Sequence, residues 1–370
     1  MTLFDGITSR LVETDRLTVG ILERTGDDAA TPPERTVVLL HDSLSSSLIW
    51  QELMQDLPSD LRIIAIDLRG FGATEHAPVD ATRGVRDFSD DVFATLAALQ
   101  IPVAHLVGWG LGGAVVMQYA LDHPVLSMTL QAPVSPYGFG GTRRDGTRLT
   151  DDDAGCGGGT IDPDLIQRLI DRDTSEDAPT SPRNVFRSFF VAPEYSSPRE
   201  DVWVEAMLTT STATGNYPGD DAPSPHWPGF AAGTTGVLNA LAPRYFDTSA
   251  MVDLSPKPPI LWVHGTADTL VSDTSFFDTR QRGAAGLLAD WPGAEEAPPQ
   301  QMVTQTRDVL EAYRSAGGQV TELRLEGAGH TPHLERPAEV RRALLSAIGY
   351  IGQPASPAPP TEAIIISSSD

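Results

Sequence analysis

The chain has 370 residues, of which 40% are hydrophobic and 21% charged, and it is long enough to bury a large globular core. Its net charge of −24 argues against nucleic acid and anionic membranes as partners, because an acidic surface repels phosphate. No apolar run reaches the roughly 18 residues that a membrane span needs, and the N-terminus lacks a secretory-signal pattern. The single cysteine, Cys156, fits a reducing compartment. We expect a cytoplasmic protein, and its oligomeric state stays open, with a homodimer among the options.

Short apolar stretches follow one another along the chain at the spacing of alternating strands and helices. The first two, Ser9–Glu13 and Leu17–Leu22, flank a tight turn and predict a hairpin. Six brief runs without alternation predict parallel strands that are covered on both faces: Thr36–Leu40, Ile63–Ile66, His105–Val107, Met128–Leu130, Ile260–Val263 and Val320–Leu325. Helical periodicity occurs at Asp87–Leu99, Gly112–His123, Val309–Ser315 and Glu339–Ile348. Together these patterns predict an α/β fold with a doubly covered, mostly parallel sheet.

Residues 135–256 break this rhythm. The segment is rich in Gly, Pro, Asp, Ser and Thr, with isolated helical patterns at Leu165–Ile170 and Val202–Leu208. More than a hundred residues between two strands far exceeds a normal connection, so we expect an inserted, mainly helical cap over the sheet. The core then comprises residues 1–134 and 257–351. A Pro-, Ser- and Ala-rich tail, 352–370, is expected to be disordered.

The most informative segment is Val103–Tyr119, in which a short apolar strand runs through GWGLGG directly into a helix. Gly108 and Gly112 lie two residues before and after Gly110, as in the G-x-S-x-G nucleophile elbow, and the pattern fails only at its centre. A glycine-rich turn without chemical meaning, or a phosphate loop, is the alternative. A dinucleotide site is disfavoured because the spacing differs from G-x-G-x-x-G.

Four other motifs follow strands in a consistent order. HDSLSSSLIW, residues 41–50, has the position and tryptophan spacing of an oxyanion loop, and DLRGFGAT, residues 67–74, follows the next strand. HGTAD, residues 264–268, follows a late strand, and GAGHTPH, residues 327–333, follows the last. Elbow, acid and histidine thus occur in the chain order of an α/β hydrolase. With these motifs the sequence resembles the α/β-hydrolase superfamily over roughly Leu17–Ile351. Within that superfamily it is most similar to the capped esterases, lactonases and epoxide-hydrolase-like members.

The resemblance implies Asp268 as the triad acid and His330 as the general base, with the backbone N–H groups of Ser43 and Leu111 as oxyanion donors. Two residues depart from the family pattern. Gly110 stands where serine is expected and has no side chain that can attack a carbonyl. Asp42 stands where the family has glycine, and a carboxylate there is expected to oppose the negative charge that an oxyanion hole stabilises.

Three interpretations of Gly110 stay open. The first choice is a hydrolase for an ester or lactone of a small apolar molecule that ordinarily has serine at position 110, so this chain is an inactivated variant with covalent turnover nearly abolished. The second is a cofactor-free proton-transfer enzyme (a lyase, isomerase or cyclase) that uses His330 and Asp268, with Asp42 as an acid partner. The third is a non-catalytic protein that binds a ligand in the same pocket.

Aromatic residues within and near the inserted segment predict an apolar pocket, and they suit an aromatic or polyketide-like substrate. Besides Asp42, the candidates for substrate binding are Trp109, Tyr137, Phe186, Phe190 and Trp227. Other aromatic residues of the segment are Phe139, Phe189, Trp203, Tyr217, Phe230, Tyr245 and Phe246. No nucleotide motif is present, and the only histidine pair at metal-ligand spacing, His330 and His333, lies in the triad loop. We therefore expect neither a cofactor nor a metal.

Overall fold

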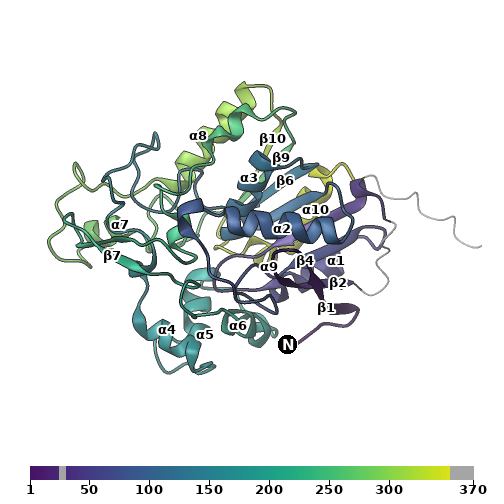
Figure 1. The fold of residues 1–370 in the computed structure, drawn as a ribbon, viewed down its shortest axis with the longest axis horizontal. Coiled ribbons are helices and arrows are strands. Elements are labelled where there is room, and N and C mark those ends of the chain that lie inside the picture. Colours follow the sequence, from purple (N-terminus) through teal and green to yellow (C-terminus); the bar gives the residue numbers. More distant parts are fainter. Residues whose placement is uncertain (25–30, 351–370) are drawn as a thin grey trace, which may run out of the picture.

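A computed structural model describes residues 1–24 and 31–350 of the chain (Figure 1). The tail expected at 352–370 lies outside the described residues. The central sheet has eight strands in the order β1-β2-β4-β3-β5-β6-β9-β10. Their bounds are β1 (Ile7–Glu13), β2 (Thr18–Arg24), β3 (Thr36–Leu40), β4 (Arg62–Ile66), β5 (His105–Trp109), β6 (Ser127–Gln131), β9 (Ile260–Gly265) and β10 (Val320–Leu325).

The strand pairing confirms the predicted sheet. β1 and β2 form the antiparallel hairpin, and β2 also runs antiparallel to β4. From β4 to β10 every neighbouring pair is parallel. Every residue of β3, β4, β5, β6 and β9 is buried, which explains why their sequences are unalternating apolar runs. Parallel strands end at one edge, so the loops after them meet there.

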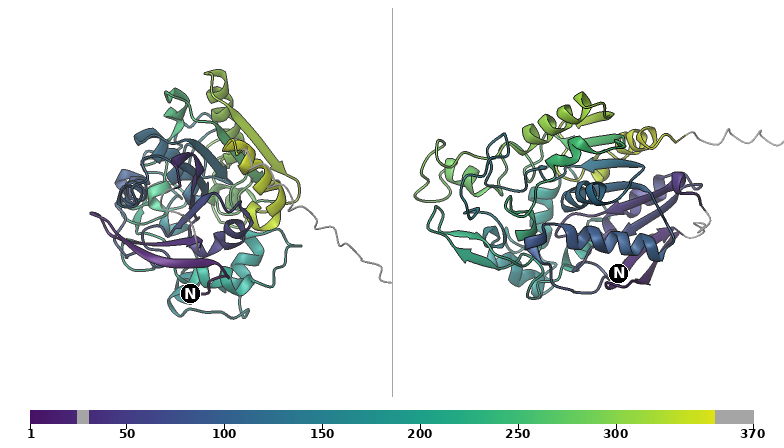
Figure 2. Two further views of the ribbon diagram at one scale, coloured as in Figure 1. Left: turned by 90° about the vertical axis from the view of Figure 1, so that its right-hand side faces the viewer. Right: turned by 45° about the horizontal axis from the view of Figure 1, so that its top comes forward.

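Helices cover both faces of this sheet (Figure 2). On one face α2 (Arg86–Ala98) packs against α3 (Leu111–Asp122), which lies on β5 and β6. On the other face α1 (Gln51–Asp56) contacts α10 (Pro337–Ala347), which lies on β9. The remaining helices of the two core parts are α7 (Thr279–Ala284), α8 (Met302–Ser315) and α9 (Pro332–Glu335). None of the described helices is long and apolar enough to cross a membrane.

The long segment 135–256, called the insertion below, connects β6 with β9 and lies beyond the carboxyl ends of the strands, in teal and green (Figure 1). It contains α4 (Pro163–Ile170), α5 (Pro182–Val185), α6 (Glu200–Leu208) and the two-stranded pair β7 (Asp221–Pro223) and β8 (Phe230–Ala232). Helices outnumber strands, but loops make up most of the insertion, as its Gly and Pro content favours. Asp162 caps α4 by accepting the N–H of Asp164.

Candidate active site

The turn from β5 into α3 has the geometry of a nucleophile elbow. Gly110 adopts φ +54° and ψ −113°, a conformation that side chains strongly disfavour. A Cβ on Gly108 would lie 2.1 Å from the carbonyl oxygen of Gly112, and one on Gly112 would lie 2.2 Å from that of Leu40. The flanking glycines are therefore required by the close approach of β3, β5 and α3, and the elbow predicted from the sequence is formed around Gly110.

The carboxylate of Asp42 occupies the predicted oxyanion hole. Its Oδ1 accepts hydrogen bonds from the backbone N–H groups of Ser43 at 2.7 Å and Leu111 at 2.6 Å. These are the two donors that the resemblance assigned to the hole. From the sequence we expect the Asp42 carboxylate to lie beside the hole and to oppose the negative charge of a substrate oxyanion. In the structure the carboxylate lies in the hole, and its own negative charge is stabilised by the two N–H donors.

The backbone of the Asp42 loop is fixed from behind by His41, which is completely buried. The N–H of Leu68 donates to Nε2 of His41 at 2.9 Å, so the ring carries its proton on Nδ1 and donates to the carbonyl oxygen of Asp42 at 2.7 Å. Burial lowers the pKa of His41, which keeps the ring neutral in this role. The loop is thereby tied to the end of β4.

His330 lies between two carboxylates. Its Nδ1 is 2.8 Å from Oδ2 of Asp268, and its Nε2 is 3.0 Å from Oδ2 of Asp42. Asp268 is held in turn, because its Oδ1 accepts the N–H groups of Leu270 at 2.7 Å and Val271 at 3.0 Å. The three groups come from the loops after β3, β9 and β10, and they form a continuous line, Asp42–His330–Asp268, which we call the relay.

The charge on His330 follows from these contacts. Burial alone would lower its pKa, but Asp268 and then Asp42 outweigh burial and raise the pKa to about 10. Nearby His333 shows the opposite effect, because burial and the charge of His330 lower its pKa to about 3. At neutral pH the relay therefore holds an imidazolium that donates to a carboxylate on each side.

The loop that carries His330 is fastened to the insertion. Glu335 accepts the N–H of Gly329 and, within the insertion, the N–H of Ala192, each at 2.9 Å. The hydroxyl of Thr331 donates to the carbonyl oxygen of Phe190 at 2.7 Å. These contacts fix the insertion and the histidine loop relative to each other.

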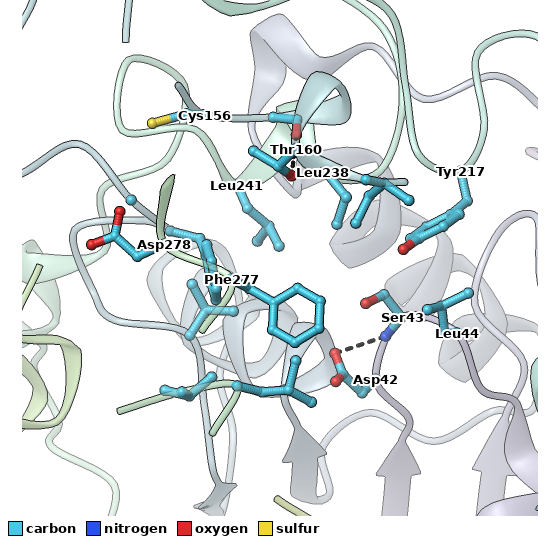
Figure 3. A pocket seen from close by; sticks show the side chains of 18 of the residues that line it. Asp42, Ser43, Leu44, Cys156, Thr160, Tyr217, Leu238, Leu241, Phe277 and Asp278 are labelled. Carbon is cyan, nitrogen blue, oxygen red and sulfur yellow. Dashed lines mark hydrogen bonds between the residues drawn. The ribbon is translucent and has the colours of Figure 1, made fainter. Parts of the chain in front are cut away.

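A mainly apolar pocket of about 880 Å³, its mouth included, opens above the relay (Figure 3). None of the residues that line the pocket is a lysine or arginine. Its floor is formed by Asp42, Gly110 and His330, and its apolar walls include Leu44, Val134, Phe139, Ile161, Leu165, Val185, Phe190, Leu238, Leu241, Leu270, Val271 and Phe277.

Of the predicted substrate-binding residues, Asp42 and Phe190 are among the described residues that line this pocket, and the other four are not. Trp109 is buried beneath it, where its indole N–H donates to the carbonyl oxygen of His330 at 2.7 Å. Phe186 lies in a second layer, stacked on Phe190 with the ring centroids 6.2 Å apart.

Tyr137 and Trp227 lie elsewhere for packing reasons. The ring of Tyr137 covers the backbone at Gly146, and the indole N–H of Trp227 donates to the carbonyl oxygen of Ala289 at 2.9 Å. Each ring thus fills a contact between loops of the insertion or between the insertion and the segment after β9.

Sequence reasoning did not select Tyr217 or Phe277. Tyr217 is buried in the insertion, and its hydroxyl points into the pocket toward Ser43 and Asp42 (Figure 3). Burial and the charge of Asp42 raise the pKa of Tyr217, so its phenol stays protonated. Phe277 comes from the segment after β9, outside the insertion, and nothing in the local sequence marks it. Tyr217 belongs to the aromatic set of the insertion, but no sequence pattern separates it from the others.

Three comparisons bear on this arrangement. RutD of Variovorax paradoxus, which is named as a carbamate hydrolase, is 41% identical over 95 residues, or 25% of this chain and 35% of that protein. A fluoroacetate dehalogenase of a Burkholderia species is 27% identical over 140 residues, or 36% of this chain and 44% of that protein. The chain thus spans 35% and 44% of the length of these two curated relatives.

Among solved structures, the esterase RhEst1 from Rhodococcus sp. ECU1013 superposes with a TM-score of 0.58 and 20% sequence identity, over 94% of this chain and 100% of that one. At this identity the likeness shows the fold alone. The sequence model of the alpha/beta hydrolase family matches residues 37–343, which include every member of the relay. The chain therefore belongs to the alpha/beta hydrolase family.

Proposed function

We propose that the protein is a hydrolase of small, uncharged, apolar molecules and that its chemistry takes place at the relay. The observation that carries this proposal is the unbroken line from Asp42 through His330 to Asp268 at the floor of an apolar pocket. An apolar wall favours apolar ligands, and the absence of lysine and arginine from the lining disfavours anionic ones. The insertion serves in this proposal as a cap that keeps bulk water from the reacting groups.

The relatives support hydrolysis without fixing the bond that is broken. One is named as a carbamate hydrolase and another as a fluoroacetate dehalogenase. A carbamate is attacked at an acyl carbon and an alkyl fluoride at an alkyl carbon, so the two names do not point to one type of bond. The ester or lactone expected from the sequence stays a prediction. What the geometry adds is that Gly110 supplies no nucleophile, so any covalent step uses a group other than residue 110.

A second candidate is supported by the contact between Asp42 and His330. A carboxylate and an imidazolium 3.0 Å apart can exchange a proton with a bound substrate without a covalent step, as in a lyase or isomerase. This function predicts turnover without incorporation of water into the product, which separates it from hydrolysis.

The test of the proposed function is a panel of three neutral probes, p-nitrophenyl butyrate, γ-nonalactone and styrene oxide. The chain should hydrolyse at least one of them, and His330→Gln should reduce that rate by about 10²–10⁴-fold, the usual contribution of a general acid–base group. His226→Gln is the matched control, because His226 is an exposed histidine of the insertion and does not line the pocket. Absence of hydrolysis with all three probes, or equal rates in the two variants, contradicts the proposal.

A further inference from the structure

The carboxylate of Asp42 fills the space that a side chain at position 110 would need. All three carboxyl atoms of Asp42 lie within 2.4 Å of the position of a Cβ atom on Gly110. The elbow after β5 has its expected backbone geometry, but the space for the nucleophile's side chain is filled by the Asp42 carboxylate, which comes from the loop after β3. A carboxylate at that point has the chemistry of a nucleophile.

The two oxygens of Asp42 have different partners. Oδ1 is held by the N–H groups of Ser43 and Leu111, whereas Oδ2 faces His330 at the floor of the pocket. Both backbone donors are therefore engaged by the enzyme's own carboxylate and do not stabilise an oxyanion on a substrate carbonyl. Attack of Oδ2 on a tetrahedral carbon requires no such oxyanion, so the arrangement suits an alkyl electrophile better than an acyl one.

We propose that Asp42 is the nucleophile of this hydrolase and that its substrates are apolar epoxides. The inference rests on the proposed hydrolase function and names its covalent group and substrate class. An epoxide is neutral, and its ring oxygen needs a proton donor as the ring opens. The site provides two such donors, the hydroxyl of Tyr217 in the pocket wall and the imidazolium of His330.

A halide leaving group fits less well. Halide ions are stabilised by N–H donors, and the indole nearest to the floor, that of Trp109, already donates to the carbonyl oxygen of His330. No tryptophan is among the described residues that line the pocket. The donors that do face the substrate are thus suited to an oxygen that gains a proton, not to an ion that leaves without one.

In the first step Oδ2 of Asp42 forms a bond to a ring carbon, and the bond from that carbon to the ring oxygen breaks. The ring oxygen accepts a hydrogen bond from the Tyr217 hydroxyl and takes the proton of His330. The product is a neutral ester on Asp42 beside a neutral imidazole. Loss of one of its two carboxylate partners lowers the pKa of His330, which turns the former acid into a base.

In the second step His330 removes a proton from water, and the water oxygen attacks Cγ of Asp42. The negative charge develops on Oδ1, which the N–H groups of Ser43 and Leu111 already contact. Collapse breaks the bond between Cγ and Oδ2, the departing alkoxide takes the proton of the hydroxyl group on Cγ, and the diol leaves with Oδ2 in one hydroxyl group. The carboxylate and the imidazolium are restored, and the sum is one epoxide and one water to one diol.

The decisive experiment is a single turnover of styrene oxide by excess wild-type protein in ¹⁸O-labelled water. The nucleophile assignment predicts that the peptide containing Asp42 gains one heavy oxygen and that the first diol released contains none. Peptides that contain Asp268 and Asp278 are the internal control and should stay unlabelled. Heavy oxygen in the diol together with an unlabelled Asp42 peptide overturns the assignment while leaving the hydrolase function intact.

The second measurement does not depend on turnover. In Asp268→Asn the ester on Asp42 should accumulate, because His330 still has Asp42 as a carboxylate partner for the first step but lacks Asp268 to support it as the base of the second. The intact mass should then increase by that of styrene oxide. Peptide mapping should locate the adduct on Asp42, and the added Asp42→Asn change should abolish it. Absence of an adduct from an Asp268→Asn protein with the circular dichroism spectrum of the wild type overturns the inference, even if p-nitrophenyl butyrate is hydrolysed.

Discussion

A Cβ atom on Gly110 would lie 2.1 Å from Cγ of Asp42, so the observed position of the Asp42 carboxylate excludes a side chain at residue 110. A serine at 110 collides with the aspartate, which is itself held by three hydrogen bonds. A glycine at 42 would leave the oxyanion donors and His330 without their partner. The two departures from the family pattern are therefore one coupled change.

Gly110→Ser alone should destabilise the protein and create no esterase. Overpacking of a filled site costs about 1–3 kcal/mol, and the positive φ of residue 110 adds strain. Urea denaturation should show the loss of stability, and p-nitrophenyl butyrate hydrolysis should not exceed that of the unaltered chain. An active, fully stable single variant would refute the coupling.

The double change Asp42→Gly with Gly110→Ser should recover stability relative to Gly110→Ser. It should also gain p-nitrophenyl ester hydrolysis, because it frees the N–H groups of Ser43 and Leu111 and places a hydroxyl beside His330. Adding His330→Gln to the double variant is the control and should remove the gained activity. If the double variant is no more active than either single one, the elbow lacks the geometry described above.

Asp42→Asn should lower the pKa of His330, since Asp42 is one of the two carboxylates that raise it to about 10. The imidazole resonances followed by NMR across pH would report this shift. Glu322→Gln is a matched control elsewhere, because Glu322 lies 2.8 Å from Nε2 of His264 and should change the titration of that histidine only. An unchanged His330 titration in Asp42→Asn contradicts the relay.

The folded state should lose stability at alkaline pH through His330. Its folded pKa, about 10, lies above the ordinary value of 6.5, so its contribution is complete below pH 6.5 and is lost as the pH rises through 10. Each pKa unit corresponds to about 1.4 kcal/mol. The difference in unfolding free energy between wild type and His330→Gln should shrink from pH 6.5 to 10, and a constant difference would contradict the assignment.

Phe277→Ala should raise KM for the apolar probe that is hydrolysed, with less effect on kcat, because the ring forms part of the pocket wall and packs against Phe189 and Phe276, not against the relay. Phe276→Ala tests the specificity of the effect. Phe276 is 41% exposed and does not line the pocket, so its removal should leave KM unchanged. Equal changes in both variants would indicate a general disturbance of this loop.

The fold was predictable from local patterns, because buried parallel strands read as apolar runs and the elbow requires glycine at 108 and 112 for steric reasons. The family order of motifs also led to Asp268 and His330. The position of the Asp42 carboxylate was not predictable, since a side-chain rotamer decides whether it points into the hole or away from it.

The pocket wall was the least predictable part. Trp109 and Phe186 belong to the right region, but their rings pack beneath the pocket, while Tyr137 and Trp227 fill contacts between loops. Phe277 reaches the pocket from a separate part of the chain. Which aromatic rings face the pocket depends on how irregular loops pack against one another, and this packing leaves no periodic pattern in the sequence.

The two hydrogen bonds that join the histidine loop to the insertion, from Thr331 to Phe190 and from Ala192 to Glu335, bear on how this enzyme family is re-engineered. Chimeras that graft one relative's lid onto another's core treat the lid as an exchangeable module. In this chain the insertion also supplies two hydrogen-bond partners to the loop of His330, so replacing the insertion also alters the support of that loop. A successful transplant has to carry residues 190–192 and 331–335 together as one matched unit.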